Sequence, residues 1–228
     1  MTFIKIFFQP KDKNLIFTIY LSLILSMVLV VGRTIYSGSL FYMFLIWNLF
    51  LAFVPFAASM VINHRKEKSG VFTFSALFGF WLLFFPNAPY ILTDMVHLKY
   101  RHGVPFWYDM ILLLSFAWNG LLLGYISLFK VQDVLEYKFG KKIAWAGVIT
   151  SIILSAFGVY IGRYMRWNSW DVITNPVSLF KELSHTIVHP FANIQVWGMT
   201  TVLSLFLMFG YFVILQLAVK PNIQTSTV

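Results

Sequence analysis

Six long apolar segments, separated by short polar stretches, run along the chain. They cover residues 14–31, 40–62, 71–85, 108–129, 143–162 and 196–219. Most approach the roughly 20 apolar residues that a helix needs to cross a bilayer. Because lipid offers no hydrogen-bond partners to the backbone, helices are the expected form of such segments. The pattern predicts an all-α fold, a polytopic transmembrane helix bundle of about six spans, with residues 1–228 in a single transmembrane domain.

The third apolar segment is short and ends at Pro86 and Pro89. Each proline lacks a backbone N–H and restricts the residue before it away from helix. A helical pattern resumes over residues 90–98, and one face of a continued α-helix carries Tyr90, Asp94, His97 and Arg101. Two interpretations fit. One is a broken span whose second half begins with free N–H groups at membrane depth, and this one enters the predicted fold. The other is a proline stop followed by an interfacial helix.

A second amphipathic pattern lies between the fifth and sixth segments. Asn175 and Pro176 have the residue types of an N-cap and a first helical position, and Pro190 marks the end of the helix. The apolar stripe consists of Val177, Phe180, Leu183 and Ile187, and the polar side carries Glu182, His185 and His189. This pattern predicts an interfacial helix on the outer side of the membrane.

The basic residues predict the orientation. With the N-terminus inside, the inner segments hold 11 of the 17 lysines and arginines, which favours a cytoplasmic location for both termini. The first segment is interpreted as an uncleaved anchor, because Arg33 and Tyr36 follow it instead of a small-residue cleavage site.

Composition excludes several classes of protein. Hydrophobic residues make up 59% of the chain and charged residues 11%, against roughly 25% charged in soluble domains, so lipid must be the main solvent. The chain has no cysteine, which excludes disulfides and thiol catalysis. The net charge of +9 comes from residues between apolar segments, so membrane lipids are the expected partners and nucleic acid is not.

Small residues recur four apart in the fourth and fifth segments. The fourth contains Gly120 and Gly124. The fifth contains Gly147, Ser151 and Ser155, and then Gly158 and Gly162. Such spacing lets helix backbones approach closely in lipid, so both segments are expected in the bundle interior. Asn48 and Asn119 lie within apolar segments, where each either hydrogen-bonds a neighbouring helix or lines a substrate path.

Three stretches together resemble a known family. They are Phe-Pro-Asn-Ala-Pro-Tyr-Ile-Leu-Thr-Asp at 85–94, the stretch from Trp107-Tyr108-Asp109 to Trp118-Asn119-Gly120, and Gly-Arg-Tyr-Met-Arg-Trp-Asn-Ser-Trp-Asp at 162–171. They are similar to the bacterial family known as domain of unknown function 1361. The resemblance implies a small polytopic protein of a bacterial cell membrane, expected to be the cytoplasmic membrane. It implies no catalytic assignment.

Polar residues gather on the predicted outer side and form the candidate binding site. They are Asn87, Asp94, His97, Asp109, Arg163, Arg166, Asn168 and Asp171. Acidic groups at membrane depth usually find partners, so Asp94 or Asp109 is expected to pair with Arg163 or Arg166. Whether these groups form a structural ion-pair cluster or a ligand site stays open. A metal is not the preferred interpretation; the candidate ligands for one are Asp94, His97, His185 and His189.

Three functions fit these features. The first is binding or transport of a small solute or lipid headgroup at an outward-facing polar site. The second is an outer-leaflet hydrolase or transferase for a lipid-linked phosphate, with Asp94 or Asp109 as general base and Arg163 and Arg166 holding the phosphate. The third is a partner subunit or assembly factor without its own site. The sequence has no Walker loop, dinucleotide fingerprint or His-Glu-x-x-His motif, so it leaves the identity of any cofactor unknown.

Overall fold

The structure is a computed structural model that describes residues 13–101 and 103–218. Its long helices are α1 (Lys13–Ser37), α2 (Phe44–His64), α3 (Val71–Phe84), α5 (Phe106–Phe139), α6 (Lys141–Tyr160) and α9 (Ile194–Ala218). The shorter elements are the 3-10 helices η2 (Phe41–Met43) and η3 (Ile91–His97), the π-helix η4 (Ile161–Met165), and the α-helices α4 (Asn87–Tyr90), α7 (Asp171–Thr174) and α8 (Pro176–Val188).

Six segments of the described chain are long and apolar enough to cross a membrane. They are Phe17–Ser37, Phe41–His64, Val71–His97, Phe106–Phe139, Lys141–Met165 and Ile194–Leu217. Large apolar side chains on their outer faces, such as Phe209 of α9 at 68% exposure, have lipid rather than water as their natural surroundings. The predicted all-α bundle of six spans is confirmed.

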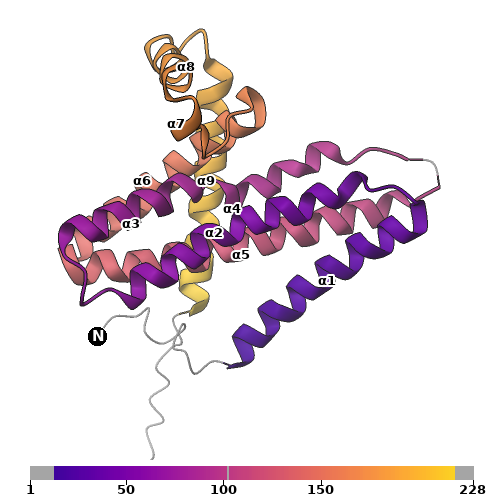
Figure 1. Cartoon of the computed structure of the whole chain (residues 1–228), viewed down its shortest axis with the longest axis horizontal. Helices are drawn as coiled ribbons and strands as arrows, with labels where there is room; N and C mark the ends of the chain where they lie inside the picture. Colours follow the sequence, from indigo (N-terminus) through magenta and orange to yellow (C-terminus); the bar gives the residue numbers. More distant parts are fainter. Residues whose placement is uncertain (1–12, 102, 219–228) are drawn as a thin grey trace, which may run out of the picture.

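The first five spans run alternately in opposite directions in Figure 1, and α9 crosses them at a steep angle. In Figure 1 the α1–α2 connection and the start of α5 lie together at the right-hand end, whereas the α2–α3 and α5–α6 connections lie at the left. An even number of spans places the start of α1 and the end of α9 on the same side. That this side is cytoplasmic stays a prediction from the charges, and residues 1–12 and 219–228 lie outside the described residues.

Helix α5 is the centre of the bundle, and it contacts α1, α2, α4, η3 and α6. It is the most buried of the six spans, so the prediction that the fourth segment is interior is confirmed. Tyr125 and Phe129 belong to the hydrophobic core shared with α3, α6 and α9. Leu112 and Phe116 belong to a second core shared with α1, α2 and η3. Both halves of the bundle therefore depend on α5.

Helix α5 is longer than its apolar pattern predicts, because it continues to Phe139 rather than ending near residue 129. Polar side chains end a hydropathy pattern without ending a helix. Here Asp133 pairs with Lys66 at 2.6 Å, and the Lys138 amine donates to the Ser69 carbonyl at 2.7 Å. These contacts join the extension to the α2–α3 connection. The helix ends at Gly140, whose φ of +85° favours glycine.

The third span is broken, as predicted. Helix α3 ends at Phe84, and the chain then passes through α4 into the 3-10 helix η3. The expected row of free N–H groups does not form: Pro86 and Pro89 have none, and those of Ala88 and Tyr90 donate to the carbonyls of Phe85 and Pro86. Proline lacks the N–H group, and short-range hydrogen bonds engage the others, so the usual free donors of a helix N-terminus are missing here.

The 3-10 geometry also changes which residues share a face. With three residues per turn, Ile91, Asp94 and His97 follow one another along η3. Arg101 lies beyond the end of η3, where its guanidinium carbon is 3.7 Å from the ring centre of Phe41. The expected continuous face from Tyr90 to Arg101 is therefore wrong at its far end.

Glycines of α5 and α6 hold the broken segment from two sides. A Cβ added at Gly120 would lie 2.7 Å from the Ala88 carbonyl oxygen, and one at Gly158 would lie 2.7 Å from the Pro86 ring. At Gly124 the added Cβ would lie 3.0 Å from the Cβ of Ala88. The small residues expected to permit close helix contacts thus form a narrow slot for residues 86–91.

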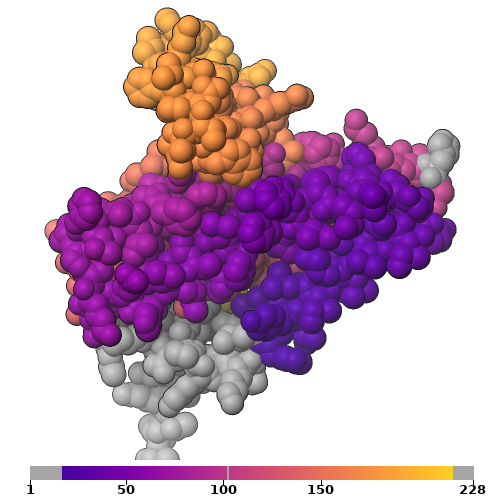
Figure 2. Space-filling view, in the orientation of Figure 1, coloured from indigo at the N-terminus to yellow at the C-terminus, as the bar shows by residue number. Residues whose placement is uncertain are grey.

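Helices α7 and α8 form a cap above the end of α6 and the start of α9 (Figure 1), and this cap projects from the bundle surface in Figure 2. Helix α8 begins with Asn175 as N-cap and Pro176 at N1, as predicted, and ends before Pro190. Of its predicted apolar stripe, Val177 and Phe180 are 79% and 74% exposed. That it lies in the membrane interface stays a prediction.

We expect Gly120→Ala to lower the free energy of unfolding in mild detergent by about 1–3 kcal/mol, because its methyl group meets a backbone oxygen that cannot move away cheaply. Gly79→Ala and Gly198→Ala are the matched controls, since each Cβ meets open space and alanine favours a helix by about 1 kcal/mol. Denaturant unfolding of the three variants measures the difference. Equal stability of Gly120→Ala and its controls would contradict the slot.

Candidate functional site

A buried ion pair joins η3 to the π-helix η4. Asp94 is 1% exposed, and Arg163 donates to one of its carboxylate oxygens from Nη2. The Nδ2 of Asn48, from α2, donates to the other oxygen at 2.8 Å. Both oxygens of this carboxylate are therefore hydrogen-bonded, as burial of a charge requires. The predicted pairing of Asp94 with Arg163 is confirmed.

The remaining nitrogens of Arg163 are also engaged. Its Nε donates to the Thr93 hydroxyl at 2.8 Å, and its Nη1 lies 3.3 Å from Nε2 of His97. Because arginine only donates, Nε2 must act as the acceptor, so His97 is neutral in this arrangement. The guanidinium carbon lies 4.2 Å from the ring centre of Tyr90. The cluster is closed: a single guanidinium occupies the space between Asp94 and His97.

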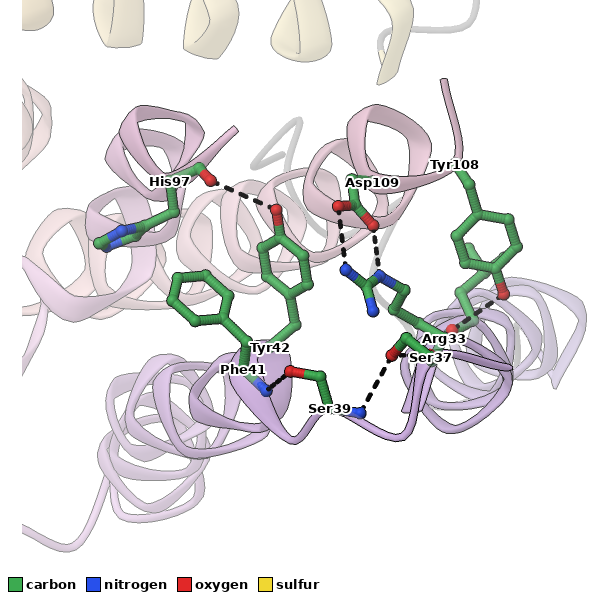
Figure 3. Close-up of polar contacts among 9 residues, drawn as sticks. Arg33, Ser37, Ser39, Phe41, Tyr42, His97, Tyr108 and Asp109 are labelled. Atoms are coloured by element: carbon green, nitrogen blue, oxygen red, sulfur yellow. Dashed lines mark hydrogen bonds and ion pairs between the residues drawn. The ribbon is translucent and has the colours of Figure 1, made fainter. Parts of the chain in front are cut away.

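Asp109 belongs to a different ion pair. Its carboxylate accepts from Nε of Arg33 at 2.7 Å and from Nη2 at 3.4 Å, and the two side chains are 2% and 4% exposed. Figure 3 shows Tyr42 between this pair and His97, whose carbonyl accepts the Tyr42 hydroxyl at 3.3 Å. Pairing of Asp109 with Arg163 or Arg166 is therefore wrong, because the end of α1 brings a nearer arginine to the start of α5.

Asp171 organises a short turn before α7. Its carboxylate accepts the backbone N–H of Asn168 at 2.6 Å and the hydroxyl of Thr174 at 3.0 Å. The hydrogen bond from the Asn168 backbone N–H holds the pKa of Asp171 below its usual range. Arg166 is exposed and adopts a left-handed φ of 63° just after η4. In the described part of the chain it has no ion-pair partner.

The histidines of α8 lie apart from the other candidates. The rings of His185 and His189 are 4.8 Å apart, and Glu182, on the same predicted face, accepts the indole N–H of Trp167 at 2.6 Å. The described residues contain no group of three histidine, aspartate or glutamate side chains placed to hold a metal ion.

A cavity of about 420 Å³ lies beside the Asp94 cluster, between α2, α3–α4, α6 and the cap. Its described lining has no charged residue. Uncharged polar groups in the wall are Asn48, Asn87, Asn168 and Ser169, with the aromatic residues Trp47, Tyr90 and Trp167. Apolar residues complete it: Leu51, Leu82, Leu83, Pro86, Leu154, Phe157, Gly158, Ile161, Gly162, Val172, Leu179 and Leu183. The predicted candidates thus separate into two cavity residues, Asn87 and Asn168, and charged residues outside the lining.

Three hydrogen bonds of Asn87 and Ser169 fix the cavity wall to the broken span. The Nδ2 of Asn87 donates to the Phe84 carbonyl at 2.9 Å and to the Ser169 hydroxyl at 3.1 Å. The Ser169 hydroxyl in turn donates to the Leu83 carbonyl at 3.0 Å. The segment after η4 is therefore joined to the end of α3, and both contribute residues to the cavity wall.

The two intramembrane asparagines were expected to be either helix contacts or substrate-path residues. Asn119 is a helix contact, since its Nδ2 donates to the Ser26 hydroxyl and the Ser22 carbonyl of α1. Asn48 is both a contact to Asp94 and a cavity residue. Arg33 was not recognised as a partner of Asp109, although a lone arginine after an apolar segment is a signal for one.

Six apolar spans and a buried, charge-paired interior define a multi-pass α-helical membrane protein. The family model described as Protein of unknown function (DUF1361) matches residues 47–214, and the chain belongs to this family. The match includes the broken span, the cavity and the cap. No curated protein and no solved structure matches the chain.

We expect Asp94→Asn to lower the free energy of unfolding by about 3–5 kcal/mol, because it leaves the Arg163 charge buried without its partner. Asp133→Asn is the control: both side chains of its pair with Lys66 are 15–16% exposed, whereas Asp94 is 1% exposed, so we expect a smaller loss than for Asp94→Asn. The double variant Asp94→Asn/Arg163→Gln should recover much of the loss. Denaturant unfolding in detergent measures all three, and equal losses at the two aspartates would count against a buried pair.

Stability of the turn at 168–174 should depend on pH. Because the pKa of Asp171 is lowered by folding, its contribution is present above the ordinary aspartate pKa and is lost as the pH falls through the lowered value. Hydrogen-exchange protection of the Asn168 amide should therefore decrease in acid. In Asp171→Asn, protection should already be low at neutral pH and should not change with acidification. A pH-dependent loss that persists in this variant would assign the effect to another group.

Proposed function

We propose that this membrane protein binds an amphipathic molecule of the bilayer in the cavity between α2, α3–α4, α6 and the cap. The observation that carries the proposal is the composition of the cavity wall. Leucine, phenylalanine and isoleucine side chains dominate it, and a few amide and hydroxyl groups interrupt them. Ligand pockets of roughly 300–1,000 Å³ usually have this mixture, in which apolar area supplies affinity and a few polar groups fix orientation.

The cap supports access from the membrane. Leu179 and Leu183 of α8 line the cavity, whereas Val177 and Phe180 point away from it and are exposed. The cap connects two spans, so it lies next to the membrane surface. An α8 helix in the membrane interface uses its exposed face for lipid and its other face to close the cavity.

Binding is better supported than phosphate chemistry. An enzyme for a lipid-linked phosphate needs free guanidinium groups and an acid–base residue around one reacting centre. The Arg163 guanidinium is engaged by Asp94, Thr93 and His97. Within the described residues, neither Arg163 nor Arg166 belongs to the cavity lining. The charged cluster stabilises the fold beside the cavity. The cavity itself presents an uncharged surface to a ligand.

Filling the cavity tests the proposal. We expect Leu51→Trp to reduce the amount of lipid that co-purifies with the full chain in mild detergent by about tenfold, equivalent to roughly 1.4 kcal/mol of binding free energy. Quantitative mass spectrometry of extracted lipid measures the loss. Leu205→Trp, on the exposed face of α9, is the matched control and should retain the bound lipid. The same lipid content in both variants would refute the proposal, provided that both unfold like the unmodified chain.

A further inference from the structure

We infer that the cavity selects an uncharged headgroup rich in hydroxyl groups, such as a glycosyl or glyceryl group, attached to an apolar chain. This inference rests on the proposed function and adds the chemical class of the ligand. It follows from the hydrogen-bonding groups that the wall leaves available and from the charges that are missing from it.

Three asparagines present acceptors. In each, the amide nitrogen is held by a group that only accepts: the Asp94 carboxylate for Asn48, the Phe84 carbonyl for Asn87, and the Asp171 carboxylate for Asn168. Because the partner cannot donate, each amide orientation is determined, and the oxygen is the free end. Within the described chain none of these three oxygens accepts a hydrogen bond.

The same wall also presents donors. The indole N–H of Trp47 and the hydroxyl of Tyr90 belong to lining residues and have no hydrogen-bond partner among the described residues. By contrast, the indole N–H of Trp167 is already used by Glu182. A ligand that pairs with all of these wall groups must both donate and accept hydrogen bonds. A hydroxyl group does both, an ammonium group only donates, and a phosphate without a proton only accepts.

Charge gives an independent reason. The described lining contains no lysine, arginine, histidine, aspartate or glutamate, and the nearby Arg163 is neutralised by Asp94. An ionic headgroup entering this cavity loses hydration without gaining an opposite charge, which is unfavourable in an apolar surrounding. An uncharged polar headgroup loses less hydration and regains its hydrogen bonds from the wall.

A set of three amphiphiles with the same alkyl chain tests the headgroup. The full chain is purified in an uncharged polyoxyethylene detergent, and decyl glucoside, decyl phosphate or decyltrimethylammonium is added at equal mole fraction in the micelle. We expect decyl glucoside to raise the unfolding temperature in a saturable manner. The two ionic amphiphiles should give no saturable increase.

Two variants remove one polar group each. In Asn168→Ala and in Trp47→Phe we expect roughly fivefold weaker binding of decyl glucoside, the loss of about one hydrogen bond. Both residues are exposed at the cavity edge, so the fold tolerates the changes. Asn193→Ala, in the connection between α8 and α9, and Trp118→Phe, on the outer face of α5, are the matched controls, and their binding should be unchanged.

The results separate the inference from the function on which it rests. A saturable effect of decyl phosphate or decyltrimethylammonium equal to that of decyl glucoside, and lost in Leu51→Trp, overturns the headgroup assignment and leaves the proposed function in place. Absence of a saturable effect for all three amphiphiles, together with unchanged lipid content in Leu51→Trp, overturns both. A glucoside effect that Asn168→Ala and Trp47→Phe leave intact also overturns the assignment.

Discussion

The close contact between the broken third span and the glycines of α5 and α6 determines the arrangement of the rest of the protein. Gly120 and Gly158 leave room for residues 86–91, whose prolines cannot continue a regular α-helix. In lipid, where helices gain little from apolar burial, such close packing is a main source of association. It brings η3 against the end of α6, and the Asp94 ion pair and the neighbouring cavity both result from this placement.

Electrostatics in a low-dielectric interior explains why the charges and the cavity are separate. An unpaired charge there costs several kcal/mol, so the buried acids Asp94 and Asp109 each take an arginine. Once paired, these groups hold elements together: η3 to η4 in one case and α1 to α5 in the other. The groups left to face the cavity are amides, a hydroxyl and aromatic rings. Under the proposed function, these groups hydrogen-bond the ligand without the energetic cost of burying a charge.

Local structure follows from the sequence where the membrane leaves a residue type few conformations or partners. Apolar length predicted the six spans, the Pro86-x-x-Pro89 pattern predicted the break, and the cost of a buried acid predicted a partner for Asp94. Prediction from the sequence is less accurate where a choice between partners is needed. The sequence offers several arginines as partners for Asp109, and the packing of α1 against α5 places Arg33 beside it.

Hydropathy alone predicted a six-span helical membrane protein, and the two prolines predicted an interruption at the end of the third apolar segment, because both effects act locally. Which polar residues meet depended on the tertiary packing. The 3-10 geometry of η3 turned Asp94 and His97 toward Arg163, and the packing of α2 and the cap enclosed Asn48, Asn87 and Asn168 in one uncharged cavity. Contacts between residues far apart in the chain depend on helix rotation and tilt. These follow from the packing of whole surfaces and not from any local pattern.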